Sequence, residues 1–113
     1  RRVLKSGGTY FFVEHVIARL ELRNVTTLHT RAEQYRPAQR FDSVVARALA
    51  KLGKFVACAG HLCAPGGRIL AMKGHVVAGE LSAIPRGWKV VAVHRVEIPG
   101  LEAERHIVEL ARA

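Results

Sequence analysis

Several residue types and patterns are scarce in this 113-residue sequence. It has two cysteines, Cys58 and Cys63, which favours a reducing compartment over a disulfide scaffold. No apolar run approaches the roughly 20 residues that span a bilayer, and no secretory signal pattern opens the chain. We therefore expect a cytoplasmic protein that does not contact membrane. The single methionine is Met72, so residue 1 is not an ordinary translation start and we expect a portion of a longer chain.

His61 lies between the two cysteines, which raises the question of a metal site. Residues five apart on a helix, such as Cys58 and Cys63, diverge by about 140° and point away from a common ion. No second pair of ligands follows downstream. We therefore predict no metal, and we interpret the two cysteines as buried helix residues beside one polar histidine.

Acidic residues are also scarce. Eighteen Lys and Arg stand against nine Asp and Glu, which gives a net charge of +9 and a pI near 10.6. The excess is uneven, because residues 1–54 carry eleven basic and four acidic side chains, and the remainder carries seven and five. A basic domain of this kind is expected to bind nucleic acid through its phosphates. A solvated basic surface is the alternative that charge alone leaves open.

Helix and strand patterns alternate along the chain. Apolar residues at helical spacing predict helices over residues 9–22, 48–62 and 77–84. Strand patterns cover residues 25–29, 41–46, 68–72, 89–96 and 105–110. Pro65-Gly66-Gly67 is expected to stop the second helix in a turn that feeds the third strand, because proline cannot continue a helix and glycine accepts a left-handed turn.

This alternation predicts a doubly wound α/β fold with a mostly parallel sheet. The last two strands are separated by Pro99-Gly100 and by no helix, which predicts an antiparallel hairpin at the sheet edge. Such an ending is typical of Rossmann-like S-adenosylmethionine-dependent methyltransferases. The chain would then be the C-terminal portion of such a fold.

A series of short motifs is more specific than the fold pattern. It runs from Arg31-Ala32-Glu33, through Phe41 to Ala48 and the Pro65-Gly66-Gly67-Arg68 stretch, to Met72-Lys73-Gly74 and Glu104-Arg105-His106. In this order and spacing, the series resembles the C-terminal half of the 16S ribosomal RNA guanine-N7 methyltransferase G family, also called glucose-inhibited division protein B. The resemblance covers the chain from about residue 9 to its end.

The resemblance implies transfer of a methyl group from S-adenosylmethionine to N7 of a guanine. It implies 16S ribosomal RNA or the small ribosomal subunit as the partner. In the family, cofactor contacts come from a glycine-rich loop and from the positions that match Ala32, Glu33 and Arg47. We assign no catalytic residue, because guanine N7 carries its own in-plane lone pair and positioning can supply most of the catalysis.

Two further basic residues are candidate RNA contacts. Lys73 ends a predicted strand at the carboxyl edge of the sheet, where open α/β sheets bind ligands, and a solvated lysine at a turn is the equal alternative. Arg105 begins the last strand and can reach RNA from the same edge. We interpret the neighbouring His106 as an ordinary residue at the margin of the core.

The sequence also departs from the family pattern. The glycine-rich loop and the strand before it are not in this chain, so residues 1–113 are expected to form a partial methyltransferase domain. Lys5 stands where the family has an acid for the cofactor ribose, and a lysine offers only hydrogen-bond donors. We expect a monomer that is inactive alone and whose intact parent is the enzyme. The alternatives are a non-catalytic basic RNA-binding module that kept the fold, and another nucleotide-binding α/β protein.

Overall fold

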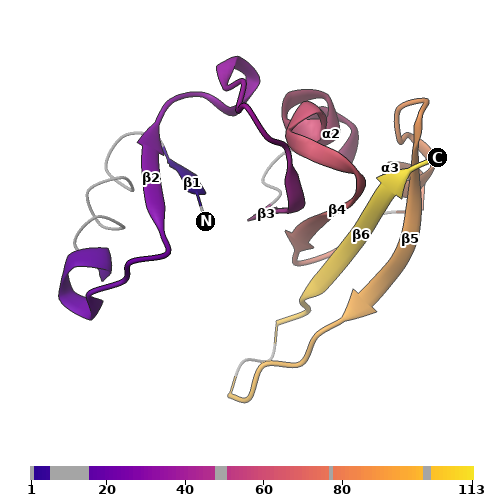
Figure 1. The fold of residues 1–113 in the computed structure, drawn as a ribbon. Coiled ribbons are helices and arrows are strands. Elements are labelled where there is room, and N and C mark those ends of the chain that lie inside the picture. Colours follow the sequence, from indigo (N-terminus) through magenta and orange to yellow (C-terminus); the bar gives the residue numbers. More distant parts are fainter. Residues whose placement is uncertain (1, 6–15, 48–50, 77, 101–102) are drawn as a thin grey trace. The chain divides into compact units, whose positions relative to one another are not determined.

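The computed structural model describes residues 2–5, 16–47, 51–76, 78–100 and 103–113 (Figure 1). The chain divides into two compact units, Arg1–Arg36 and Pro37–Ala113. Each unit is described by itself below. No helix in the described ranges is both long and apolar enough to cross a membrane.

The first unit contains a two-stranded parallel sheet. Strand β1 (Arg2–Lys5) pairs with β2 (Thr26–His29), which confirms the strand expected near residues 25–29. Residues 16–20 are helical, and the helix ends two residues before the expected end, because Glu21 adopts a left-handed backbone with φ of 52°. The expected start of that helix, residues 9–15, lies outside the described residues. A single 3-10 turn, η1 (Ala32–Gln34), follows β2.

The second unit is built on a four-stranded sheet with the order β3-β4-β6-β5 (Figure 1). Its strands are β3 (Phe41–Arg47), β4 (Cys63–Lys73), β5 (Trp88–Arg95) and β6 (His106–Arg112). Strand β3 is parallel to β4, and β6 is antiparallel to both β4 and β5. The expected hairpin at the edge is confirmed. Within it β5 is the outermost strand, and the antiparallel strand β6 lies one position inside.

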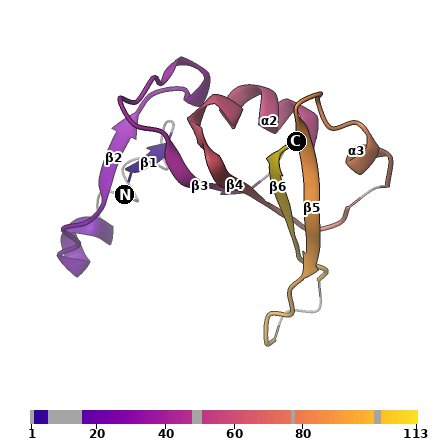
Figure 2. The ribbon, with the colours of Figure 1, turned by 45° about the vertical axis from the view of Figure 1, so that its right-hand side comes forward.

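Helix α2 (Leu52–Ala59) packs on one face of this sheet and builds the core (Figure 2). Leu52 and Val56 lie four residues apart on one stripe of the helix, and they cluster with Ile69 of β4 and Leu110 of β6. Burying one such side chain contributes about 1.5–3 kcal/mol to stability. This cluster therefore fixes the helix to the two central strands.

The second helix is shorter than residues 48–62, the range expected from the sequence. Lys51 has an extended backbone, with φ of −61° and ψ of 150°, so α2 begins at Leu52. Residues 48–50 lie outside the described residues. At its other end the helix tightens into a 3-10 turn, η2 (Gly60–Leu62), and the chain then enters β4. The third predicted helix, residues 77–84, is reduced to α3 (Ala78–Ser82).

The prediction of a turn at Pro65-Gly66-Gly67 was wrong, because these residues lie inside β4. The strand begins at Cys63, and between the pairs Phe41–Cys63 and Ser43–Arg68 it advances five residues while β3 advances two. The surplus residues form a bulge in the ladder. Gly67 is required there, since a Cβ at this position would lie 2.6 Å from the carbonyl oxygen of Asp42.

The sheet face opposite α2 is more open. Val45 of β3 and Met72 of β4 lie on it and are 54% and 41% exposed. Across the same face, Glu109 accepts from Arg68 Nε at 3.2 Å and lies 3.1 Å from His94 Nε2. The face thus combines exposed apolar side chains with one polar ladder. Strand β3 forms one edge of the sheet, with β4 as its single neighbour among the described strands.

Candidate functional site

Three basic residues end the three strands that run in the same direction. Strands β4 and β5 are both antiparallel to β6, and β3 is parallel to β4, so their carboxyl ends share one side of the sheet. Arg47, Lys73 and Arg95 are the last residues of β3, β4 and β5. We call this side the carboxyl edge. Open α/β sheets bind their ligands at such an edge.

The strand register divides these residues between two faces. His106 stands opposite both Lys73 and Arg95, so these three side chains belong to one face of the sheet. Arg47 stands opposite Met72 and belongs to the other face. Arg47 is exposed and makes no hydrogen bond or ion pair within the described part of the chain. The sequence prediction that Arg47 emerges at the carboxyl edge is confirmed, whereas its role is not tested by its position.

Lys73 is engaged by an acidic partner from α3. Its ammonium group binds Oε1 of Glu80, and the two side chains are only 12% and 10% exposed. The same oxygen accepts a hydrogen bond from the backbone N–H of Leu52 at 3.0 Å. Glu80 therefore accepts from a free backbone N–H of the first turn of α2 and also pairs with the lysine that ends β4. The first turn of α2 has no acidic residue of its own to fill this role.

The start of β6 is fixed by one histidine. Nδ1 of His106 lies 2.7 Å from the carbonyl oxygen of Gly74, and because a carbonyl only accepts, Nδ1 carries the proton. This agrees with the interpretation of His106 as a residue of the core margin. Arg105 is half-buried beside it and donates through Nη1 to the carbonyl oxygen of Glu104 at 2.8 Å.

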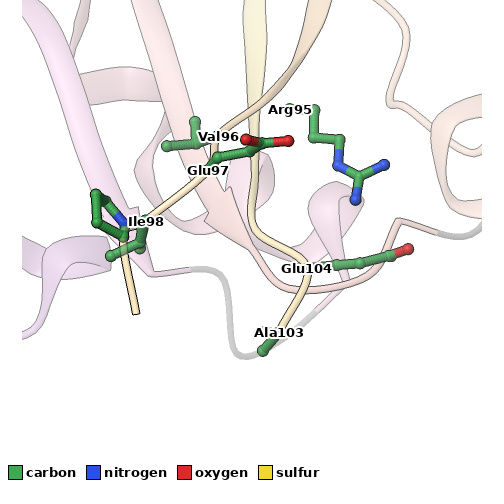
Figure 3. A pocket seen from close by; sticks show the side chains of 7 residues that line it. Arg95, Val96, Glu97, Ile98, Ala103 and Glu104 are labelled. Carbon is green, nitrogen blue, oxygen red and sulfur yellow. The ribbon is translucent and has the colours of Figure 1, made fainter. Parts of the chain in front are cut away.

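A pocket opens where β5 and β6 continue beyond the sheet. Its volume is about 430 Å³, and Figure 3 shows the side chains that line it: Arg95, Val96, Glu97, Ile98, Pro99, Ala103 and Glu104. Beside it, Nδ1 of His75 lies 3.1 Å from Oε2 of Glu104. That hydrogen bond, together with the nearby charges of His75, Arg95 and His106, lowers the pKa of Glu104 below its ordinary value. Glu104 is therefore ionised at neutral pH.

The expected cofactor residues occupy two different units. Ala32 and Glu33 form the η1 turn that follows the carboxyl end of β2 in the first unit, and Arg47 belongs to the second. The turn is braced by Arg36, whose Nη1 donates to the backbone oxygen of Glu33 at 2.7 Å. The Glu33 side chain is exposed, and among the described residues it has no hydrogen-bond or ion-pair partner.

At the opposite end of the sheet, a basic side chain is engaged by the fold. Arg112 lies 4.6 Å from the centre of the Trp88 ring, and its Nη2 donates to the carbonyl oxygens of Gly60 and Cys63 at 3.1 and 2.8 Å. Burial raises the pKa of the Cys63 thiol above 9.0, although the charges of Arg112 and Arg68 oppose this shift. Among the described residues no group of three His, Cys, Asp or Glu side chains could hold a metal ion.

Solved structures of other proteins share the fold of this chain. The chain superimposes on TrmN from Thermus thermophilus with a TM-score of 0.74 at 18% identity, over 99% of this chain and 36% of that one. It matches a rRNA methylase from Streptococcus thermophilus with a TM-score of 0.67 at 10% identity, over 98% and 72%. The fold is therefore that of a Rossmann-like methyltransferase, in an α/β unit with a mixed sheet.

Sequence relatives identify the family within this class. Residues 9–108 match the model of the family described as rRNA small subunit methyltransferase G. The ribosomal RNA small subunit methyltransferases G of Xanthomonas oryzae and Aromatoleum aromaticum are 40% and 44% identical, over 98% and 89% of this chain. The chain belongs to this family, as its motifs predicted. It spans about half the length of these relatives, 52% and 48%.

Proposed function

We propose that the intact protein carrying this chain methylates N7 of a guanine in 16S ribosomal RNA, with S-adenosylmethionine as the methyl donor. The family match over residues 9–108 is the observation that supports this proposal. The small ribosomal subunit, or its free RNA, is the proposed substrate particle.

The carboxyl edge suits this function because of its charge. It brings together Arg47, Lys73, Arg95 and Arg105 within the second unit, and basic side chains bind RNA mainly through phosphates. Arg105 is the better placed of the two RNA-contact candidates, since its guanidinium group donates to a neighbouring carbonyl oxygen and pairs with no described carboxylate. The Lys73 ammonium group already binds Glu80, so its contact with RNA stays a prediction that requires exchange of that partner.

The residues present fit one part of the cofactor. The Ala32–Glu33 turn follows a parallel strand and offers an exposed, unpartnered carboxylate, which can accept hydrogen bonds from the adenosine end of S-adenosylmethionine. Lys5, the last residue of β1, offers only donors where the family has an acid that accepts from the cofactor ribose. Ala32 and Glu33 in the first unit and Arg47 in the second remain our proposed cofactor residues, as the family resemblance implies.

The reaction places few chemical demands on this chain. When bound, S-adenosylmethionine supplies an electrophilic methyl group on a sulfonium. Guanine N7 holds an in-plane lone pair and needs no base to remove a proton. The residues of the carboxyl edge then act by binding and orienting the RNA, and proximity of this kind lowers a barrier by up to about 7–11 kcal/mol.

The proposal is tested with the intact protein and small ribosomal subunits that lack the modification. We expect transfer of labelled methyl groups from S-adenosylmethionine to guanine N7 of 16S ribosomal RNA, located by chemical cleavage at the modified base. RNA binding without methyl transfer would instead support the non-catalytic RNA-binding module, and Lys5 is the sequence feature that favours that alternative.

Arg47→Ala is the variant that tests the site assignment. Arg47 is exposed and unpartnered within the described residues, so its removal should leave stability unchanged. We expect a loss of methyl transfer of about tenfold or more through misplaced reactants. Arg40→Ala is the matched control, because Arg40 is also exposed and lies before the amino end of β3. Equal rates for the two variants would remove Arg47 from the site.

A further inference from the structure

A pocket at the carboxyl edge of the second unit is lined by two charged side chains that make no hydrogen bond or ion pair with the described residues. Its seven lining residues come from the end of β5 and from the two sides of the hairpin that leads to β6 (Figure 3). A volume of about 430 Å³ lies within the range of roughly 300–1,000 Å³ that small-molecule sites occupy. We call it the hairpin pocket.

Two oppositely charged side chains, Arg95 and Glu97, line the hairpin pocket. The backbone N–H of Val96 donates to the carbonyl oxygen of Arg105 at 2.8 Å, so the ladder continues one residue beyond β5. Arg95 and Glu97 flank that residue and both face the pocket. Neither makes a hydrogen bond or ion pair with any residue that the structure describes. Both are therefore available to a ligand.

The other polar groups around the pocket are already engaged. Glu104 lies 3.1 Å from His75, His106 donates to Gly74, and Lys73 binds Glu80. The positive charge of Arg95 is one of the nearby charges that lower the pKa of Glu104. Of the charged side chains that line the pocket, Arg95 offers donors and Glu97 offers acceptors that no described residue uses.

This pair matches the Watson–Crick edge of guanine. That edge presents the O6 acceptor beside two donors, N1–H and the N2 amino group, and a carboxylate can accept from both donors. Adenine presents an acceptor at N1, which a carboxylate repels. Uracil presents one donor between two acceptors, and cytosine an amino group beside two acceptors. Guanine alone offers two adjacent donors to a carboxylate and an acceptor to a neighbouring guanidinium group.

Holding guanine by this edge also leaves the right atom free. N7 lies on the Hoogsteen edge, opposite N1 and N2, so it would point away from the carboxylate. Unpaired bases in single-stranded RNA expose both edges to a protein at the same time. A pocket that binds the Watson–Crick edge can therefore select guanine while it leaves N7 unobstructed.

We propose that the hairpin pocket binds the target guanine, with Glu97 accepting from N1–H and the N2 amino group and Arg95 donating to O6. This inference rests on the proposed function and names the residues that select the base. It gives a role to the Glu97 carboxylate, which has no hydrogen-bond or ion-pair partner among the described residues. Removing either hydrogen-bond partner leaves the other unpaired, and such sites discriminate strongly against analogues that lack one group.

The test compares three short single-stranded RNAs that differ at one central position, which holds guanosine, inosine or adenosine. Inosine keeps O6 and N1–H and lacks the N2 amino group. Binding to the intact protein is measured at one fixed salt concentration, without cofactor. We expect wild-type protein to bind the guanosine RNA about tenfold or more tightly than the inosine RNA, and the adenosine RNA more weakly still.

Two variants separate the roles of the two residues. Glu97→Gln should bring the guanosine-to-inosine ratio close to one, because the amide cannot accept from both donors. Arg95→Gln should weaken binding of guanosine and inosine RNA alike and keep their ratio, since both bases carry O6. Glu21→Gln removes the same charge from an exposed position in the first unit and should keep the wild-type ratio.

A wild-type protein without preference for guanosine, or a Glu97→Gln variant with the wild-type ratio, would overturn the inference. Both variants change exposed side chains, and unchanged melting temperatures verify that they remain folded. Methyl transfer by the wild-type protein to ribosomal RNA is measured alongside. Methylation together with an unchanged Glu97→Gln ratio refutes the pocket alone. A guanosine preference without any methylation refutes the proposed function and keeps the pocket as a guanine-binding site.

Discussion

The ladder between β5 and β6 carries an arginine at each of its ends, and the two are used differently. At one end Arg112 stands opposite Trp88, contacts its ring and donates to two backbone carbonyl oxygens. At the other end Arg95 stands opposite His106 and has no hydrogen-bond partner among the described residues. Arg112 thus stabilises the fold at the end of the ladder where β5 begins. Arg95 remains available for binding at the end where β5 finishes.

This difference separates charges that stabilise from charges that can bind. A guanidinium group whose donors reach carbonyl oxygens contributes to stability through charge-assisted hydrogen bonds. One without partners contributes little to the fold and can be offered to a ligand at no cost in packing. Lys73 complicates the contrast, because it lies at the carboxyl edge and is nevertheless paired with Glu80.

The largest expected effect on stability comes from Lys73→Met. This change leaves the Glu80 carboxylate, only 10% exposed, without its cation. Breaking a largely buried pair in this way should lower the free energy of unfolding by about 3 kcal/mol. Urea denaturation of the intact protein measures it. The double variant Lys73→Met with Glu80→Gln should recover part of the loss. Wild-type stability of the single variant would show that the pair with Glu80 does not stabilise the fold.

Arg112→Met should cost somewhat less, about 2 kcal/mol, because it removes the contact with Trp88 and the hydrogen bonds to the carbonyl oxygens of Gly60 and Cys63. Its matched control at the other end of the ladder is Arg95→Gln, for which we expect a change within about 0.5 kcal/mol. Equal losses for the two variants, measured in the same denaturant series, would end the contrast between the two ends of the ladder.

Arg105→Gln should affect RNA binding and not folding. Arg105 donates to one neighbouring carbonyl oxygen at the carboxyl edge. If it also neutralises one phosphate, its loss should reduce the slope of log K against log salt by about 1 unit. A salt titration of RNA binding measures the slope. An unchanged slope together with unchanged affinity would show that Arg105 contacts no phosphate.

The smallest expected effect is on the pH dependence of stability and concerns Glu109, which lies in the middle of the β5–β6 ladder. The hydrogen bond from His94, followed by that from Arg68, lowers the pKa of Glu109 below its ordinary value of 4.5. A group with a lowered folded pKa stabilises the fold above its ordinary value, and this stabilisation is lost as pH falls through the folded value. We therefore expect Glu109→Gln to flatten the decline of melting temperature below pH 4.5. The same decline in variant and wild type would contradict the pairing.

The order of elements could be predicted from the sequence, whereas the details that position the site could not. Segments rich in apolar and β-branched residues predicted β3, β4 and the final hairpin, because such residues favour strands. Pro65-Gly66-Gly67 misled the prediction, since the same residues serve a turn and a bulge. Only the close approach of Gly67 to Asp42 in the folded chain distinguishes the two.

The candidate site was predicted in part for a similar reason. Arg47 and Lys73 were found as charged residues that end buried strands, and the same rule would have found Arg95 at the end of β5. Glu80 was missed as the partner of Lys73 because their contact depends on where α3 packs. Glu97 was missed because the sequence does not show which charged neighbours pair with one another. Only the structure shows that Lys73 pairs with Glu80 and His75 with Glu104.

Strand β3 has β4 as its one described neighbour, and its outer backbone groups face no strand that the structure describes. Arg47 is the last residue of this strand. Any segment of the intact protein that hydrogen-bonds along β3 would hold Arg47 in place. A ligand that binds only that paired form would in turn strengthen the pairing by mass action. Pairing along β3 and binding of the methyl donor would then be thermodynamically coupled. Adding the cofactor would slow amide hydrogen exchange in β3.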